Sequence, residues 1–131
     1  NLLLNVGPDT RGLLPETDMD RLAELTAELR RRFGSPLGEA TGPAERLAVS
    51  FDRPTPVNHA TIREYSGRDE RVRQFRVMAQ IKGRWEGVHV GTAIGAQRIA
   101  QFPTVVADAV AVHVDRSDDD AQLKHLQVFY C

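Results

Sequence analysis

Residues 75–90 read FRVMAQIKGRWEGVHV and contain a regular alternation of side chains. Phe75, Val77, Ala79 and Ile81 occupy every second position, with one other side chain between neighbouring members. Because successive side chains of a strand point to opposite faces, this spacing predicts a strand that buries one face. Turn residues follow the alternation, so the stretch favours short strands over a helix.

The same spacing of two recurs between turn residues from Arg46 to the end of the chain, and we find no helical period there. Several short strands of this kind are typical of an antiparallel β-sandwich. We therefore expect a mainly β fold. The apolar residues of the expected strands lie within 47–51, 57–62, 75–81, 85–90, 99–102, 110–114 and 126–130.

The beginning of the chain has a different character. Asn1–Val6 form a short apolar run, which predicts a strand buried on both faces, as in a parallel sheet. From about Pro15 to Phe33, apolar residues recur at steps of three and four, which predicts a helix with one apolar face. The residues of that face are Met19, Leu22, Leu25, Leu29 and Phe33.

These patterns divide the chain into three parts. Residues 1–34 are expected to form one βα unit, and residues 46–131 a β-sandwich. Between them, residues 35–45 are rich in Gly, Pro and small side chains, which indicates a linker. The expected architecture is therefore an antiparallel β-sandwich preceded by a single strand and helix.

Composition and charge exclude several classes of partner. Apolar residues make up 41% of the chain and charged residues 27%, which is typical of a globular protein. The net charge of -1 gives no reason to expect nucleic acid or an anionic membrane as a partner. The single cysteine, Cys131, leaves no internal disulfide to form.

No residue pattern indicates a metal, a cofactor or a catalytic group. The four histidines lack the spacing of metal ligands, and His89 and His113 alternate with valines, which places them on the outer faces of strands. Asp118-Asp119-Asp120 could contribute oxygens to a Ca²⁺ site, but a solvated loop is the simpler interpretation. We therefore expect no metal site, no cofactor and no catalytic residue in this chain.

Aromatic side chains are the remaining candidates for ligand binding. Trp85, Tyr65 and Phe102 could form a platform on which a sugar ring stacks. For Trp85 the alternative is core packing, since it begins a strand that continues with valines. Tyr65 lies in a polar turn, so it is the better surface candidate, with an ordinary loop tyrosine as the alternative.

The segments together resemble the C-terminal end of a glycoside hydrolase family 29 α-L-fucosidase. NLLLNVGPDTRGLLPE, residues 1–16, resembles the stretch in which the last strand of the family's TIM barrel ends in Asn-(Ile/Val)-Gly-Pro and a Gly-x-(Ile/Leu)-Pro turn opens the next helix. Three further segments resemble the β-sandwich that follows the barrel in this family. They are VNHATIRE (57–64), ERVRQFRVMAQIKGRWEGVHVGTAIGAQRI (70–99) and LKHLQVFY (123–130). That sandwich is similar to galactose-binding, discoidin-like jelly rolls, many of which bind sugars.

The resemblance implies a parent enzyme that releases α-linked L-fucose from glycans with retention, using an aspartate nucleophile and a separate carboxyl acid/base. Both groups belong to barrel segments that this chain does not match, so no catalytic residue is carried over. Asn5, at the end of the expected barrel strand, is a candidate neighbour of the sugar site. The resemblance also suggests a secreted, periplasmic or lysosomal type of location.

Three functions remain open at this stage. The chain could be a non-catalytic accessory portion whose partner is the missing catalytic barrel. It could instead be a stand-alone carbohydrate-binding module for fucosylated glycans, with Asn5, Tyr65 and Trp85 as candidate ligand-binding residues. The third function is a structural interaction domain. Leu2, Leu3 and Leu4 are expected to pair with the sandwich, pack under the helix or mediate self-association.

Overall fold

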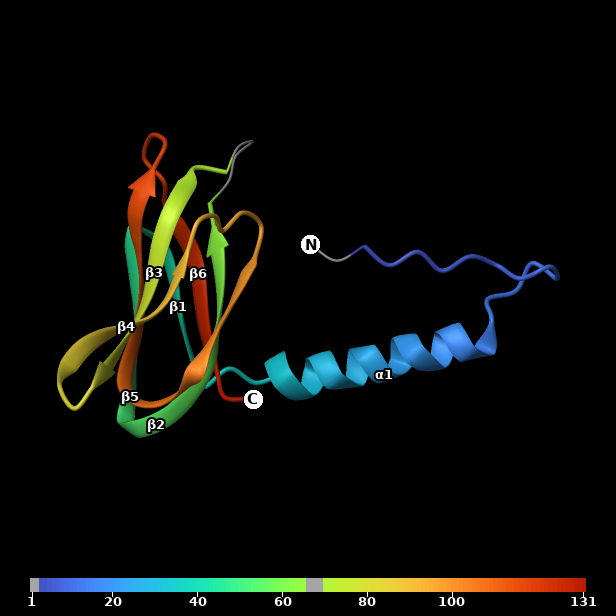
Figure 1. The fold of residues 1–131 in the computed structure, drawn as a ribbon, viewed down its shortest axis with the longest axis horizontal. Helices are drawn as coiled ribbons and strands as arrows, with labels where there is room; N and C mark the ends of the chain where they lie inside the picture. Colours follow the sequence, from blue (N-terminus) through green and yellow to red (C-terminus); the bar gives the residue numbers. More distant parts are fainter. Residues whose placement is uncertain (1–2, 66–69) are drawn as a thin grey trace. The chain divides into compact units, whose positions relative to one another are not determined.

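The computed structural model describes residues 3–65 and 70–131. The chain divides into two compact units, Asn1–Ser35 and Pro36–Cys131. Figure 1 shows a helix in the first unit and strands in the second. The elements are α1 (Glu16–Phe33), β1 (Gly38–Ala44), β2 (Arg46–Glu64), β3 (Val72–Ile81), β4 (Arg84–Gly91), β5 (Arg98–Ser117) and β6 (Leu123–Phe129).

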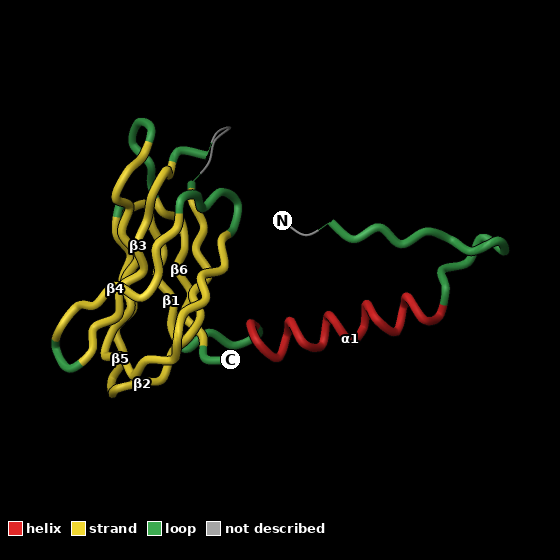
Figure 2. Tube along the Cα trace, viewed as in Figure 1, coloured by secondary structure: helices red, strands yellow, loops and turns green. Residues whose placement is uncertain are grey.

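The second unit is an antiparallel β-sandwich made from one folded sheet. Its six strands are ordered β1-β6-β2-β5-β3-β4, and every neighbouring pair is antiparallel. The long strands β2 and β5 belong to both layers, and their pairing is interrupted between Ser50 and Thr55. On one side of this bend β2 pairs with β6, and on the other β5 pairs with β3 (Figure 2). The sandwich expected from the sequence is therefore confirmed.

The core lies between the two layers and is filled by the alternating residues of the strands. Aliphatic side chains dominate it, which fits the period-two pattern that predicted the strands. Burial of this kind is the main favourable contribution to folding. The largest fully buried side chains of the core are Val57, Ile62, Val72, Phe75, Val77, Val110, Val112, Leu123, Leu126 and Val128.

The expected linker over residues 35–45 contains a strand instead. Gly38–Ala44 form β1, which pairs with β6 at the edge of the sheet. Gly42 permits this pairing, since a Cβ at that position would lie 1.9 Å from the carbonyl oxygen of Leu123. The glycine and the small residues of this segment thus allow two strands to approach closely, although the same composition had predicted a linker.

The expected strand Asn1–Val6 is not formed by its described residues, 3–6. A strand is held by hydrogen bonds to a neighbouring strand, and the described part of the first unit contains none. The expected helix is confirmed as α1, with acidic residues in its first turn and Arg30, Arg31 and Arg32 in its last. This helix lacks the long apolar stretch that crossing a bilayer would require.

Candidate functional site

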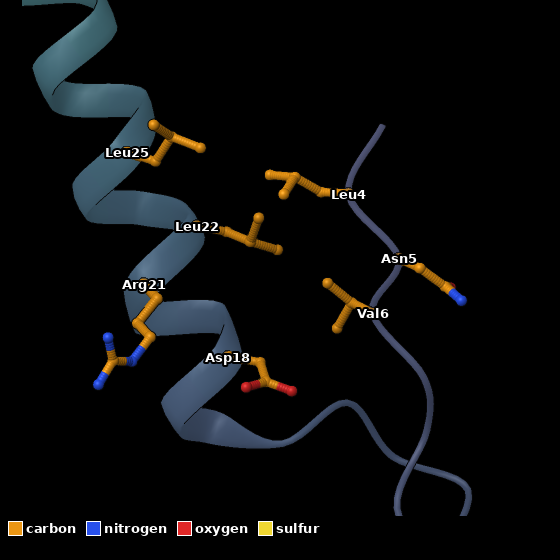
Figure 3. A pocket seen from close by; sticks show the side chains of 7 residues that line it. All are labelled: Leu4, Asn5, Val6, Asp18, Arg21, Leu22 and Leu25. Carbon is orange, nitrogen blue, oxygen red and sulfur yellow. The ribbon is translucent and has the colours of Figure 1, made fainter. Parts of the chain in front are cut away.

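Asn5 lies in the first unit, beside a hollow of about 280 Å³ between the N-terminal segment and α1. Figure 3 shows Leu4 and Val6 pointing toward the helix, while the Asn5 side chain points away from it. Leu22 and Leu25 line the same hollow from α1. Of the leucines that were expected to pair with the sandwich, pack under the helix or mediate self-association, Leu4 lines this hollow but is 50% exposed. Leu3 is 93% exposed, and Leu2 lies outside the described residues.

Trp85 lies on the face of the sandwich that points away from the core. It is opposite Gln80, which is in turn opposite Ala109. Ala79 and Val110, the neighbours of these two positions on β3 and β5, belong to the core. Trp85 is 37% exposed, and the Arg46 guanidinium lies over its ring at 5.0 Å from the ring centre. This cation–π contact places the guanidinium group against one face of the indole ring.

Two other side chains differ in position from the expectation. Phe102 is buried in the core, so it cannot contribute to a surface platform. His89 was expected on an outer face, but it lies opposite the buried Val77, with its ring centre 6.0 Å from that of Phe75. The cause is an irregularity in the pairing of β3 with β4 next to Val77, which changes the alternation of β4. His113 lies on the outer face as expected, opposite Arg76.

Tyr65 and Trp85 lie at opposite ends of the sandwich. Tyr65 follows the end of β2, next to Glu64, whose carboxylate binds the first residue of β3, Val72. Trp85 is opposite Gln80, near the other end of β3. Eight residues of strand separate these two ends, which corresponds to about 26 Å. The three aromatic residues therefore do not form one platform.

The best candidate site is a hollow of about 240 Å³ around Tyr65, which we call the Tyr65 hollow. Its lining consists of Arg63, Glu64, Tyr65, Ala96 and Lys124. Tyr65 is 44% exposed, and its backbone N–H donates to the carbonyl oxygen of Gln122 at 2.8 Å. The ammonium group of Lys124 lies 5.8 Å from the centre of the tyrosine ring. Aromatic and cationic groups thus meet at this end of the sandwich.

Glu64 holds the walls of the Tyr65 hollow together. The residue is only 3% exposed, and its Oε1 accepts hydrogen bonds from the backbone N–H groups of Arg71 (2.7 Å) and Val72 (3.0 Å). Its Oε2 accepts a longer bond of 3.4 Å from the N–H of Gly95. The buried carboxylate therefore ties the end of β2 to the start of β3 and to the connection between β4 and β5.

Lys124 reaches the hollow through a β-bulge. Arg63 is opposite His125 and Glu64 is opposite Leu123, so Lys124 is an extra residue on β6. The bulge allows Leu123 to be fully buried while the neighbouring Lys124 is exposed. Bulges commonly redirect a side chain at functional sites, and this one brings an ammonium group to the tyrosine.

The described lining of the Tyr65 hollow combines an aromatic ring with two cationic side chains. A ring face, a guanidinium group and an ammonium group can contact a polar ligand. Glu64, the only carboxylate among the described lining residues, already accepts three hydrogen bonds. Among residues 3–65 and 70–131 no group of three or more His, Cys, Asp or Glu side chains is arranged to hold a metal ion. Sequence reasoning identified Tyr65 but missed Glu64, Arg63 and Lys124.

Comparison with known proteins finds similarity at the level of structure. Neither a family model nor a curated protein matches the sequence. An assigned α-L-fucosidase from Bacteroides thetaiotaomicron aligns with 96% of the chain at 31% identity and a TM-score of 0.89. A glycoside hydrolase 29 family member from an unknown rumen bacterium aligns with 97% of it at 25% identity and a TM-score of 0.80. The chain spans 29% and 25% of the lengths of these two proteins.

A third similarity concerns the fold alone. A chitosan-binding module from a Paenibacillus chitosanase/glucanase aligns with 70% of the chain, at 12% identity and a TM-score of 0.56. The aligned part is 74% of the length of that module. The sandwich architecture is therefore shared with a protein that differs almost completely in sequence.

Proposed function

We propose that this chain, which belongs to the glycoside hydrolase family 29 α-L-fucosidases, is the non-catalytic C-terminal portion of such an enzyme. The observation that carries the proposal is the alignment of 96% of the chain at 31% identity to a much longer assigned fucosidase. The enzyme as a whole would release α-linked L-fucose from glycans with retention. In this account the β-sandwich supports a catalytic barrel supplied by the rest of the protein.

The state of Glu64, the carboxylate among the described lining residues of the Tyr65 hollow, supports the non-catalytic role. Glycoside hydrolysis requires two carboxyl groups about 5–9.5 Å apart that are free to act on the sugar. Glu64 is buried, and its two oxygens are engaged by backbone N–H groups of three residues. A carboxylate held in this way positions the loops around it. If it moved to act on a sugar, the backbone N–H groups that now donate to it would lose their acceptor.

The proposal is tested with purified 131-residue chain and a chromogenic aryl α-L-fucoside. We expect no release of the aryl group above the buffer rate, while a complete family 29 enzyme hydrolyses the same substrate in a parallel reaction. Turnover that copurifies with the 131-residue chain would overturn the non-catalytic role.

We propose a second function, carbohydrate binding at the Tyr65 hollow, because one observation favours it. An exposed aromatic ring and two hydrogen-bonding cationic side chains line one hollow, and a buried carboxylate fixes its walls. Such a combination of a flat apolar surface and oriented polar groups suits a sugar. The test is a titration of isotope-labelled chain with L-fucose, followed by amide NMR. Unchanged amide signals of Tyr65 and Ala96 at millimolar sugar would overturn fucose binding.

A further inference from the structure

We propose that the Tyr65 hollow selects saccharides that carry a negative charge, as a carboxylate or a sulfate ester, over neutral ones. This inference rests on the second proposed function, carbohydrate binding at the same hollow. It assigns the chemical class of the ligand from the charges that line the hollow.

The first argument is the pair of cations that line the hollow. Arg63 and Lys124 come from adjacent strands, β2 and β6, and neither forms an ion pair with a carboxylate in the described parts of the chain. The Nη2 of Arg63 donates to Gln97 Oε1 at 3.0 Å, which holds the guanidinium group in place without neutralising it. A ligand that enters the hollow therefore meets two positive groups.

The second argument is the engagement of the nearby negative charge. Glu64 is the acidic residue among the lining residues that the structure describes, and three backbone N–H groups donate to its carboxylate. These dipoles compensate the charge of a side chain that is almost fully buried. The carboxylate thus orders the loops, while the accessible groups of the hollow remain cationic and aromatic.

The third argument is the geometry of the ring and the ammonium group. Lys124 Nζ lies 5.8 Å from the centre of the Tyr65 ring, and the β-bulge brings it there. A sugar placed against the ring would hold its substituents next to this ammonium group. A carboxylate or sulfate at that position gains a charge-assisted hydrogen bond, and Arg63 offers the planar donors that such groups accept.

The charge of the chain as a whole cannot produce this preference. The net charge is -1, so a uniform field would slightly repel an anion. Selectivity for a charged sugar must therefore come from a local group of cations. At the other end of the sandwich, Arg84 is an exposed cation at the first position of β4 and serves as a comparison.

The test is an amide NMR titration of the 131-residue chain with D-glucuronate, D-glucose, L-fucose and inorganic sulfate at low ionic strength. We expect glucuronate to shift the signals of Tyr65 and Ala96 and to bind at least fivefold more tightly than glucose, consistent with one or two partly exposed ion pairs. Lys124→Gln and Arg63→Gln should each reduce this ratio, whereas Arg84→Gln should leave it unchanged. Added salt should reduce it as well.

Each other outcome overturns a distinct part of the proposal. Equal binding of glucose and glucuronate at Tyr65 would overturn the charge selectivity and leave sugar binding intact. If inorganic sulfate binds as tightly as glucuronate, the hollow recognises the anion alone, and the selection of a charged saccharide is overturned. No shift with any of the sugars would overturn the selectivity together with the second proposed function. If Arg84→Gln lowers the ratio of glucuronate to glucose affinity as much as Lys124→Gln and Arg63→Gln do, the overall charge of the chain, and not the hollow, causes the preference.

Discussion

Glu64 and Gly95 are joined by two hydrogen bonds that run in opposite directions. The backbone N–H of Glu64 donates to the carbonyl oxygen of Gly95 at 3.3 Å, and the N–H of Gly95 donates to Glu64 Oε2 at 3.4 Å. Gly95 has a positive φ of 64°, and a Cβ there would lie 2.4 Å from Glu70 Oε1. The connection between β4 and β5 is therefore fixed in a conformation that favours glycine, and Glu64 is its anchor.

Substitution of the anchor should destabilise the sandwich. In Glu64→Gln, the NH₂ group would face backbone N–H donors that now face an oxygen, so at least one donor loses its partner. We expect a loss of about 1–3 kcal/mol in the free energy of unfolding, measured by urea denaturation. Glu86→Gln, an exposed acid on β4, is the control and should change stability by less than about 0.5 kcal/mol. Equal stability of the two variants would contradict the anchoring role.

Two glycines of β4 provide a matched test of core packing. A Cβ on Gly91 would lie 2.4 Å from the Phe75 ring, whereas a Cβ on Gly87 would meet no atom within 4 Å. Because Phe75 is fully buried and cannot move aside freely, Gly91→Ala should cost about 1–3 kcal/mol in stability. Gly87→Ala should be close to neutral in the same thermal or urea unfolding experiment. A neutral Gly91→Ala would show that β4 does not pack on Phe75 as described.

The contact between Arg46 and Trp85 should be measurable as a coupling energy. The two residues come from β2 and β4, which are separated by two strands in the sheet, and they meet over its outer face. A double-mutant cycle with Arg46→Ala and Trp85→Ala should give a coupling of about 0.5–1 kcal/mol. The same cycle with Arg98→Ala in place of Arg46→Ala should give a value near zero. Coupling energies of equal size in both cycles would contradict a specific contact between Arg46 and Trp85.

Acid should weaken the sandwich through Glu39. The His125 side chain, 3.0 Å away, and then Gln127 hold the pKa of the Glu39 carboxyl below its ordinary value of 4.5. Because the pKa is lower in the folded chain, this group stabilises the fold above about pH 4.5, and the contribution is lost as the pH falls through the folded pKa. Urea denaturation at pH 7, 5 and 3 should show a smaller loss in Glu39→Gln than in the unmodified chain. Identical losses would exclude this contribution.

The regularity of the core strands made the sandwich predictable. Phe75, Val77 and Ala79 alternate because β3 buries only one face, and that face fills the core. Where the partner strand decides the structure, the sequence pattern was insufficient. Gly38–Ala44 form β1 through pairing with β6, whereas residues 3–6, which are mostly apolar, form no strand in the absence of a neighbouring one.

The candidate site was predictable in part for the same reason. Tyr65 was expected at the surface because its surroundings are polar, and it is exposed. Glu64 carried a signal that the sequence analysis did not use, since it continues the buried positions Ala60 and Ile62 on β2. The position of Lys124 depends on a bulge, which arises from the register of two strands and has no signature in one of them.

The central claim, that this chain is part of a larger fucosidase, is tested most directly by the intact mass of the natural protein. The protein can be isolated from its source cells with an antibody raised against the 131-residue chain and measured by mass spectrometry. The account predicts a mass of roughly three to four times 14.6 kDa, since the chain spans 29% and 25% of two members of the family. A natural protein of 14.6 kDa that is not associated with a barrel subunit would contradict it.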